Sequence, residues 1–512
     1  MPDLAMRPSR VAGASLSAIE ARVGGDLEGP DVTVTGATVD SRAIEPGDLF
    51  CALPGENIHG VRFAAQAAAA GAAAILTDLD GAPAARATGL PVLVTTHPRR
   101  ATALAAAEVY GDPSRDFPVI GLTGTNGKTT TSFLIEGALS TVHDAVGLLG
   151  TVEMRIGDQS APSARTTTEA PMLQGLLARM REAGVTAAVA EASSQAIALD
   201  RVTGTRFAVV LFTNLSYEHL DFHHTMEEYF EEKARIFTPE FADRAVVLVD
   251  DEWGRLLVDE VTVPVETVAT RPGSPRADWN AVDAEPTARG GMRFVLVAPD
   301  GSRHDVEVPL PGIINVSNAA GAIVAAHAIG VPLAAAIRGV EHARRVPGRT
   351  EVVTARDATT PLTVVDYAHT PDGLASVLDA MRGVTPGRLF VVFGCDGLRD
   401  DSKRPGLGAA AATHADVVIV TDENPRTEPP GQIRARILEG VDAERPDRRD
   451  VLEISPRLAA VERAVRMAGP GDTIIATGKG HETTQEIDGV HHPYTDAAAF
   501  LAALAAVREA RA

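Results

Sequence analysis

A glycine-rich segment after residue 120 has the residue types and spacing of a phosphate-binding loop. It reads Gly-Leu-Thr-Gly-Thr-Asn-Gly-Lys-Thr-Thr-Thr over 121–131 and follows the apolar run 117–120. The pattern predicts a buried strand, a tight turn and a helix that begins near Lys128, an arrangement that stabilises a polyphosphate. Lys128 would neutralise the β- and γ-phosphates, and the Thr129 hydroxyl would bind Mg²⁺. Leu122 replaces the first glycine of a strict G-x-x-x-x-G-K-T loop, which argues against an ordinary GTPase or ATPase motor. The alternative is a glycine-rich turn without a ligand.

A carboxylate and a group of histidines follow two further apolar runs. The run 187–191 predicts a buried strand that ends in Glu191, a position suited to a magnesium-binding carboxylate. A capping or solvated glutamate is the alternative. Residues 214–224 are rich in possible metal ligands, and the spacing of His219 and His223 could place both on one helical face for zinc. We favour the interpretation in which one histidine assists a hard Mg²⁺ near ATP.

A turn in the C-terminal third presents an arginine after an apolar run. It reads Asp-Glu-Asn-Pro-Arg over 422–426. A rigid turn that presents Arg426 beside Arg399 suits bidentate recognition of the carboxylate of a small molecule. The alternative is a structural arginine that pairs with Asp422 or Glu428.

The composition limits the class of protein. At 512 residues the chain is too long for one core, and about three domains are expected. The net charge of −21 disfavours nucleic acid or anionic lipid as a partner, so an anionic substrate must meet local clusters of Lys, Arg and backbone N–H groups. The chain has only two cysteines, and we see neither an apolar leader nor an apolar run of membrane-spanning length. We therefore expect a cytoplasmic protein without membrane insertion.

Strand and helix patterns divide the chain into three sections. The first mixes short β-like runs with alanine-rich helical patterns, and the second opens at the strand before the glycine loop. Within the second section, 271–303 is polar and rich in Pro and Gly, which indicates β-hairpins or an insertion. A breaker cluster at 344–349 marks the second boundary. The expected domains are 1–116, 117–345 and 346–512.

The third section alternates strands with helices. This alternation predicts a parallel sheet that is covered by helices and binds ligands at the carboxyl ends of its strands. Four chemically suggestive side chains follow the expected strands: Asp366, Asp396, Asp422 and Lys479. The expected strands are 362–367, 389–394, 417–421 and 473–477, and the expected helices are 371–381, 406–413, 432–439 and 458–467.

Taken together, these motifs resemble the Mur ligase family. The resemblance rests on Thr-Gly-Thr-Asn-Gly-Lys-Thr-Thr at 123–130, Glu191, Asn-Leu-Ser-Tyr-Glu-His-Leu-Asp at 214–221, Asn318 and Asp-Tyr-Ala-His-Thr-Pro at 366–371. It covers nearly the whole chain, from Asp-Ser-Arg at 40–42 to Gly-Lys-Gly-His-Glu at 478–482. The resemblance implies an α/β fold of three domains: an N-terminal α/β domain that binds a UDP-sugar, a central P-loop ATPase domain with a mostly parallel sheet, and a Rossmann-like C-terminal domain.

The resemblance also implies an activity. The chain looks most like the family members that add diaminopimelate to the D-glutamyl γ-carboxylate of UDP-N-acetylmuramoyl-L-alanyl-D-glutamate in peptidoglycan precursor synthesis. The expected route is in-line transfer of the ATP γ-phosphate to that carboxylate, with two Mg²⁺ ions spreading the charge, and then attack by the diaminopimelate amine. ATP is a co-substrate, and no protein nucleophile is needed. We expect a monomer that acts on small molecules without a nucleic-acid partner.

The functional residues of the family carry over to matching positions in this sequence. The implied catalytic residues are Lys128, Glu191, His219 and Lys233, and the implied metal ligands are Thr129, Glu191, His219 and carbamylated Lys233. The implied ATP-binding residues are Gly124, Thr125, Asn126, Gly127, Lys128, Thr129, Thr130, Asn318, Arg349 and Asp366. Those for the UDP-muramoyl dipeptide are Ser41, Asn57, His59, Thr166, Thr167, Ser193 and Arg201, and those for diaminopimelate are Arg399, Asn424, Arg426, Gly478 and Glu482. Without the resemblance, Lys233 reads as an ordinary exposed lysine of an amphipathic helix over 229–237.

Departures from the family pattern leave the amino-acid substrate open. They are Thr168, Gln195 and Leu199 in the predicted peptide site, and Asp396, Leu398 and Glu423 in the predicted amino-acid pocket. A related ligase that adds another amino acid, such as L-lysine, is therefore one alternative. A folylpolyglutamate-synthase-like ligase is a second, although those enzymes usually continue Gly-Lys-Gly-Ser where this chain has Gly-Lys-Thr-Thr at 127–130. The choice between meso- and LL-diaminopimelate also stays open here.

Overall fold

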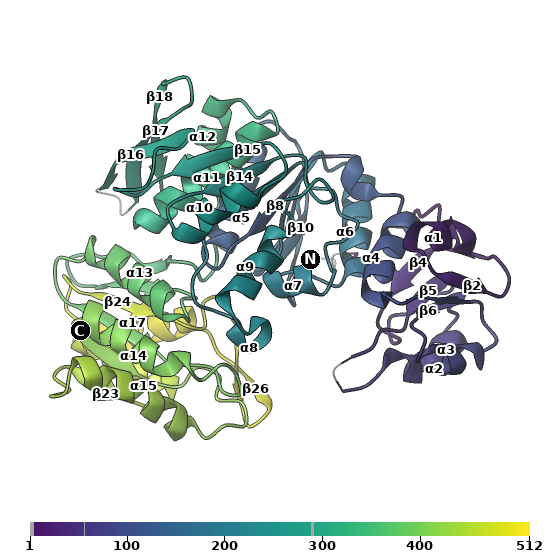
Figure 1. Ribbon diagram of the computed structural model, residues 1–512. Coiled ribbons are helices and arrows are strands. Elements are labelled where there is room, and N and C mark those ends of the chain that lie inside the picture. Colours follow the sequence, from purple (N-terminus) through teal and green to yellow (C-terminus); the bar gives the residue numbers. More distant parts are fainter. Residues whose placement is uncertain (1–4, 56, 288–290, 512) are drawn as a thin grey trace. The chain divides into compact units, whose positions relative to one another are not determined.

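The structure is a computed structural model that describes residues 5–55, 57–287 and 291–511 (Figure 1). The chain forms two compact units. Unit 1 comprises the chain up to Leu215, Phe222–Val268 and Gly321–Ala343, and unit 2 comprises Ser216–Asp221, Ala269–Ala320 and the chain from Arg344 onward. In the described part of the chain, no helix is both long and apolar enough to cross a bilayer.

The N-terminal part of unit 1 is a five-stranded sheet with helices on both faces. The spatial order is β2-β7-β6-β5-β4, with parallel pairing except for antiparallel β2. Alternate strand residues face opposite ways: Leu49 and Leu76 pack with the α1 and α4 side, whereas Phe50 and Ile75 pack with α2 and α3. The elements are β1 (Ala14–Ser15), α1 (Leu16–Val23), β2 (Asp26–Glu28), β3 (Thr33–Val34), β4 (Gly36–Thr38), β5 (Asp48–Cys51), η1 (Gly60–Phe63), α2 (Ala64–Ala69), β6 (Ala74–Thr77), α3 (Ala82–Arg86), β7 (Val92–Val94), α4 (Pro98–Val109) and η2 (Pro113–Arg115).

A second sheet in unit 1 positions the predicted phosphate loop. Its parallel strands have the order β9-β12-β8-β13-β14-β15, and β10 and β11 continue antiparallel from β9. Strands β8, β12 and β13 are buried along their whole length, which accounts for their continuous apolar sequences. The elements are β8 (Val119–Thr123), α5 (Lys128–Leu139), β9 (Val146–Leu149), β10 (Glu153–Ile156), β11 (Gln159–Pro162), α6 (Ala170–Glu182), β12 (Ala187–Glu191), α7 (Ser194–Ala198), β13 (Val209–Phe212), α8 (Leu220–His223), α9 (Met226–Ala234), β14 (Ala245–Leu248), α10 (Glu252–Glu260), β15 (Val265–Ala269) and α12 (Leu333–Glu341).

Unit 2 contains a six-stranded sheet of order β19-β20-β24-β21-β22-β23, parallel except for β19. Leu378 and Ile437 pack the α13–α15 side onto one face, whereas Val461 and Phe500 pack α16 and α17 onto the other. The elements are β19 (Glu351–Thr354), β20 (Leu362–Val365), α13 (Pro371–Arg382), β21 (Leu389–Phe393), α14 (Lys403–His414), β22 (Val417–Val420), α15 (Pro430–Glu444), β23 (Val451–Glu453), α16 (Arg457–Met467), β24 (Thr473–Ala476), β25 (Thr484–Ile487), β26 (Val490–Pro493) and α17 (Asp496–Arg511).

The predicted α/β fold with mostly parallel sheets is confirmed, as are the four strands and four helices expected in the third section. The polar segment forms antiparallel β16 (Trp279–Pro286), β17 (Met292–Val297) and β18 (Arg303–Val308), followed by α11 (Ile313–Ala328). The strands β19, β23, β25 and β26 and the helix α17 of unit 2 were not predicted. The domain boundaries at 116/117 and 345/346 stay predictions.

Candidate active site

The predicted phosphate loop lies between β8 and α5 in unit 1. Gly124 has a φ of 142°, and a Cβ there would lie 2.0 Å from Thr213 Oγ1, so glycine is required. The residues after β13 hold the loop in place. Thr213 Oγ1 donates to the Asn126 carbonyl at 2.8 Å, and the Asn126 N–H donates to Asn214 Oδ1 at 2.9 Å. The loop leads directly into α5 at Lys128, as predicted, which is the arrangement that stabilises phosphate at a helix N-terminus.

Two lysine side chains converge on one carbonyl of this loop. Lys128 Nζ donates to the carbonyl oxygens of Gly124 and Thr125, each at 2.8 Å, and Lys233 Nζ donates to that of Gly124 at 3.1 Å. Lys233 is 1% exposed, and its Nζ lies 4.6 Å from the centroid of the Tyr229 ring. The interpretation of Lys233 as an ordinary exposed lysine is therefore wrong. Both amines therefore lie at the loop that is predicted to bind phosphate.

Glu191 is a buried carboxylate beside the loop. Its Oε1 accepts from the Thr151 N–H at 3.1 Å and the Ser132 hydroxyl at 3.3 Å, and its Oε2 accepts from the Thr129 and Thr151 hydroxyls at 3.2 and 2.7 Å. At 1% exposure it is not a solvated or capping glutamate. All four donors are hydroxyl or amide groups rather than cations. A buried carboxylate next to a threonine hydroxyl fits Mg²⁺, which takes one or two carboxylates and completes its shell with water and phosphate oxygens.

The histidine pair does not form a helical metal site. His219 precedes α8 and has a φ of 59°, so it does not share a helical face with His223. His223 is buried, and its Nε2 lies 2.9 Å from Ser194 Oγ. Among the described residues, no group of three or more His, Cys, Asp or Glu could hold a metal. The zinc alternative therefore has no support, and the role of His219 near Mg²⁺ stays a prediction.

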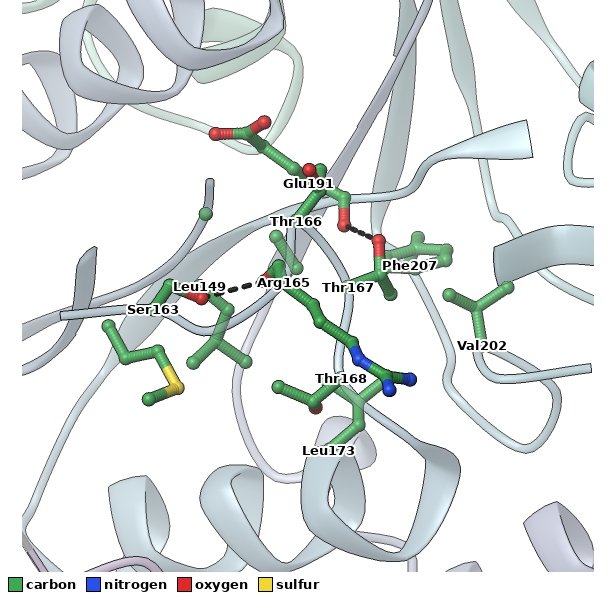
Figure 2. A pocket seen from close by; sticks show the side chains of 13 residues that line it. Leu149, Ser163, Arg165, Thr166, Thr167, Thr168, Leu173, Glu191, Val202 and Phe207 are labelled. Atoms are coloured by element: carbon green, nitrogen blue, oxygen red, sulfur yellow. Dashed lines mark hydrogen bonds between the residues drawn. The ribbon is translucent and has the colours of Figure 1, made fainter. Parts of the chain in front are cut away.

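Residues predicted to bind the muramoyl dipeptide surround the end of β12. Thr166 and Thr167 line a pocket together with Glu191 (Figure 2). Thr167 Oγ1 donates to the Glu191 carbonyl at 2.8 Å, the contact drawn as a dashed line in Figure 2, and accepts from the Ser193 N–H at 3.1 Å. Arg201 Nη1 donates to the Thr167 carbonyl at 3.3 Å. The fold thus brings residues 166–167 together with residues 191–201, which lie 24 or more positions further along the chain.

Arg201 keeps a donor for a ligand. Its Nη2 pairs with Glu169 at 2.8 Å, whereas its Nε is buried and has no hydrogen-bond partner in the described structure. Burial lowers the pKa of Arg201, and Glu169 opposes that shift. A guanidinium with an open donor suits a carboxylate of the peptide substrate.

The three residues predicted to bind the uridine nucleotide lie in the N-terminal part of unit 1. Ser41 is buried, and Asn57 is exposed. His59 Nδ1 accepts from the Val61 N–H at 3.0 Å, and its Nε2 lies 3.0 Å from Asp78 Oδ1. Because Nδ1 accepts from Val61, Nε2 is the nitrogen that donates to Asp78.

Two residues predicted to bind ATP lie in unit 2 with unused polar atoms. Asn318 Nδ2 donates to Asn315 Oδ1 at 3.0 Å, whereas its Oδ1 is buried without a donor among the described residues. This free acceptor suits the exocyclic amine of adenine. The Arg349 guanidinium lies 4.2 Å from the centroid of the Tyr367 ring, and its buried Nε has no acceptor in the described structure. An open guanidinium donor suits a phosphate or ribose oxygen.

Asp366 organises the turn after β20. Its Oδ2 accepts from the Thr350 N–H at 2.6 Å, and its Oδ1 accepts from the Ala368 N–H at 2.7 Å. Both carboxylate oxygens therefore hold backbone groups in place, and a direct contact of Asp366 with the nucleotide stays a prediction.

The predicted diaminopimelate residues gather at the carboxyl edge of the unit 2 sheet. Asn424 Nδ2 donates to Asp396 at 3.0 Å and to Glu482 at 2.9 Å. Arg426 Nη1 and Nη2 donate to Glu486 and Asp396, each at 3.2 Å. The partners expected in the structural alternative, Asp422 and Glu428, instead pair with Arg434 and Arg404. Arg399 is exposed on the loop after β21.

Glu423 lies beneath this pocket and is 5% exposed. A Cβ on Gly478 would lie 2.2 Å from Glu423 Oε2, so only glycine lets the two chains approach this closely. Burial, and then repulsion by Asp396, raise the pKa of Glu423 to about 7. Near neutral pH this carboxyl is therefore partly protonated.

We expect a Glu423→Gln substitution to remove a pH dependence of stability. The folded protein holds the Glu423 proton more tightly than the unfolded chain, whose pKa is near 4.5. The stability that Glu423 contributes is therefore present below the unfolded pKa and lost as pH rises through about 7. The variant should gain roughly 1–3 kcal/mol over wild type between about pH 5 and about pH 8. Urea unfolding of both proteins at the two pH values measures this gain, with a substitution of the exposed Glu444, Glu444→Gln, as the control. If the free energies of unfolding of Glu423→Gln and wild type differ by the same amount at both pH values, the prediction is wrong.

His369 is not free to act as a base in this structure. Its Nδ1 lies 2.9 Å from the Tyr367 carbonyl, and its Nε2 lies 3.1 Å from Glu218 Oε1. Both ring nitrogens are therefore engaged by oxygen atoms of the protein. One of these contacts must break before His369 could deprotonate the attacking amine.

Three side chains in these sites were not identified from the sequence. Thr151 donates to Glu191, the Tyr229 hydroxyl lies 3.1 Å from Thr125 Oγ1, and Ser132 donates to Glu191. A signal existed for Thr151, because it follows a buried strand in the same parallel sheet. Tyr229 reads only as the apolar face of its helix.

Comparisons with known proteins were made for the whole chain. Three family models match: "Mur ligase family, catalytic domain" over 33–110, "Mur ligase middle domain" over 122–326 and "Mur ligase, glutamate ligase domain" over 348–480. These matches confirm the resemblance drawn from the motifs.

Full-length relatives agree with these matches. The UDP-N-acetylmuramoyl-L-alanyl-D-glutamate--2,6-diaminopimelate ligase of Streptomyces avermitilis is 48% identical over 493 residues, 96% of each chain. The UDP-N-acetylmuramyl-tripeptide synthetase of Leifsonia xyli is 43% identical over 499 residues, again 96% of each. A solved structure of a UDP-N-acetylmuramoyl-L-alanyl-D-glutamate--2,6-diaminopimelate ligase has a TM-score of 0.67 at 32% identity and covers 97% of this chain and 99% of its own.

Proposed function

Because this chain belongs to the Mur ligase family, we propose that it is an ATP-dependent ligase that joins 2,6-diaminopimelate to UDP-N-acetylmuramoyl-L-alanyl-D-glutamate. The bond formed is an amide on the D-glutamyl γ-carboxylate, in the synthesis of a peptidoglycan precursor. The site observation that carries the proposal is the convergence of Lys128 and Lys233 on the Gly124 carbonyl, in a loop built for phosphate. The substrate class is inferred from the family, and the transfer of phosphate is inferred from the residues of the site.

The phosphate loop positions ATP in this proposal. Lys128 swings from the loop carbonyls onto the β- and γ-phosphates, and the α5 N-terminus donates N–H groups to them. Asn318 Oδ1 accepts from adenine. Thr129 and Glu191 would hold Mg²⁺, which lowers the cost of the charge that develops on the transferred phosphoryl group.

Carbamylation of Lys233 belongs to the same proposal. The cationic side chain first loses a proton, and the uncharged amine then adds to CO₂ and releases a second proton, which leaves a carbamate anion. The buried Nζ, held at the Gly124 carbonyl, then carries oxygen atoms suited to a second Mg²⁺ or its water shell. After this change, the Lys128 ammonium lies near an anion rather than near a second ammonium. His219 would complete this second site.

Phosphorylation makes the γ-carboxylate reactive. A carboxylate resists attack because the amine would have to displace oxide, whereas an acyl phosphate releases inorganic phosphate. The γ-phosphorus–oxygen bond of ATP breaks as a bond to the carboxylate oxygen forms, and ADP leaves. The amine then forms the amide and loses a proton. Thr167, Ser193 and Arg201 hold the peptide during both steps, so that catalysis is mostly positioning.

The decisive experiment measures phosphate release from ATP with the UDP-muramoyl dipeptide and a panel of amino acids. We expect release that depends on dipeptide and diaminopimelate together, with meso- and LL-diaminopimelate compared directly. Release with L-lysine alone would identify a related ligase for another amino acid, an alternative kept open by the departures at Asp396, Leu398 and Glu423. Release that requires a folate and glutamate would overturn the proposal.

Arg426 should decide between diaminopimelate and L-lysine. L-Lysine lacks the distal carboxylate and leaves the guanidinium with a donor unpaired, a penalty of roughly 2–5 kcal/mol, or about 30- to 4000-fold in selectivity. Arg426→Ala should lose most of that preference, measured as the ratio of kcat/KM for the two amino acids. Arg434→Ala is the matched control, because Arg434 also pairs with two carboxylates in unit 2. A wild type that prefers L-lysine, or an unchanged ratio in Arg426→Ala, would refute the assignment.

We further propose that the enzyme works in the cytoplasm as a monomer. Two buried, unpaired cysteines are compatible with a reducing compartment. All of the proposed substrates are small, water-soluble molecules. Sedimentation of the purified protein with and without ATP measures its oligomeric state.

A further inference from the structure

The loop after β21 places Asp396 at a fixed position beside the predicted amino-acid pocket. The Asp396 carbonyl accepts from Arg404 Nη2 at 3.2 Å, and the next N–H, that of Gly397, donates to the Asn424 carbonyl at 2.9 Å. Arg404 is itself 3% exposed and bound through both terminal nitrogens by Glu428. The backbone of Asp396 is therefore anchored on both sides.

The side chain of Asp396 binds the two residues most suited to recognise the distal end of the substrate. Its Oδ1 accepts from Asn424 Nδ2 at 3.0 Å, and its Oδ2 accepts from Arg426 Nη2 at 3.2 Å. The Asp396 side chain remains 23% exposed, so a ligand can still reach this carboxylate.

Glu423, by contrast, has a buried carboxylate. The residue is 5% exposed, and its Oε2 is buried against Gly478 without a hydrogen-bond donor in the described structure. A carboxylate in this position cannot pair with an ammonium group without leaving the interior. A ligand can therefore reach the carboxylate of Asp396 but not the carboxylate of Glu423.

Arg426 can bind a substrate carboxylate while Asp396 stays in place. A guanidinium has five N–H donors, and Glu486 and Asp396 each take one from the terminal nitrogens. Each terminal nitrogen of Arg426 therefore keeps a second N–H for a ligand. The arginine and the aspartate thus offer a cation and an anion side by side, which matches the ammonium and carboxylate groups at the distal end of diaminopimelate.

We propose that Asp396, and not Glu423, joins the predicted diaminopimelate residue Glu482 in receiving the distal ammonium of the amino-acid substrate, while Arg426 receives its distal carboxylate. This assignment rests on the proposed ligase function and makes Asp396 a specificity-determining residue. It gives a role to a position where the sequence departs from the family pattern. It also assigns the two distal groups of the substrate to different side chains, which can be tested separately with substrate analogues.

The test compares three amino acids on wild type and Asp396→Asn. Diaminopimelate carries both distal groups, L-lysine carries the ammonium alone, and 2-aminopimelate carries the carboxylate alone. Asp396→Asn should weaken diaminopimelate and L-lysine by about 10- to 100-fold, the range for a hydrogen bond between charged groups. It should leave 2-aminopimelate unchanged or tighter, because Arg426 is released from one carboxylate. KM for diaminopimelate and L-lysine, and the competitive inhibition constant for 2-aminopimelate, measure these effects.

Four further variants separate recognition from structure. Glu486→Gln removes the other carboxylate bound to Arg426. It should not selectively weaken the two amino acids that carry a distal ammonium. Glu423→Gln should leave the three amino acids in their wild-type order. Asp401→Ala, on the same loop, controls for loop stability, and Asp396→Ala repeats the main test without a side-chain amide.

The outcomes distinguish the two levels of the proposal. If wild type releases no phosphate with any of the amino acids, the proposed function fails. If wild type uses diaminopimelate but Asp396→Asn weakens all three amino acids equally, Asp396 only supports the fold of the pocket and the inference is overturned. A selective loss of the ammonium-bearing substrates in Glu423→Gln instead of Asp396→Asn would also overturn it.

Discussion

Replacement of Lys128 by alanine is expected to reduce phosphate release from ATP by about 10³-fold or more, on the scale of other charged groups that stabilise a transferring phosphoryl group. In the structure the ammonium lies 2.8 Å from two loop carbonyls, at the N-terminus of α5. No other side chain of the loop 121–131 carries a positive charge. Steady-state phosphate release with saturating dipeptide and diaminopimelate measures the loss.

The fold should survive this substitution. The loop is held by Thr213, Asn214 and the Asn126 backbone, not by Lys128 alone. We therefore expect a circular dichroism spectrum and a Tm close to those of wild type. Lys403→Ala, at the start of α14, controls for the general loss of a lysine. A folded Lys128→Ala variant with normal phosphate release would remove the ATP site from this loop.

Replacement of Lys233 by alanine should reduce activity by about 10²- to 10³-fold, because it removes a group preorganised at the site of phosphoryl transfer. Activity should return in part when a short carboxylic acid such as acetate or propionate is added. The acid would occupy the space of the carbamate and supply the same pair of oxygens. Titration of the variant with acid at fixed pH measures this recovery.

The rescue separates a chemical role of Lys233 from a structural one. Lys233 is buried against Tyr229 on α9, so its loss also leaves a cavity and some activity could be lost through misfolding. Glu231→Ala, on the same helix, should be insensitive to added acid. Mass spectrometry under CO₂ should show an increase of about 44 Da on wild type, from the mass of CO₂. An active enzyme with unmodified Lys233, or equal rescue by a neutral amide, would contradict carbamylation.

The loop 121–131 and the family of this protein could be predicted from the sequence because their signals are local. A glycine with positive φ, a lysine at the first turn of a helix and a preceding buried run act within a few residues of one another. The same holds for the strands of unit 2, whose apolar sequences gave β20, β21, β22 and β24 with small errors at their ends. The full-length similarity to Mur ligases is consistent with these local signals.

Burial and charge pairing were decided by the tertiary structure. Lys233 reads as a surface lysine until the fold brings it to Gly124, 109 residues away. His219 and His223 have helical spacing, but the backbone at His219 turns to a φ of 59° and separates them. Such outcomes depend on which distant segment covers a side chain, and no pattern of neighbouring residues contains that information.

The contacts within the predicted amino-acid pocket could not be derived from the sequence either. From the sequence, Arg426 and Arg399 indicated a carboxylate site, and Asp396 and Glu423 were both departures from the family pattern in the predicted pocket. Only the folded chain brings Asp396 onto Arg426 and Asn424 and turns Glu423 into the interior against Gly478. The sequence therefore determined which chemical groups this protein has and which family it belongs to. The tertiary structure decided which carboxylate a ligand can reach, because access depends on the packing of β21, β22 and β24 in one sheet.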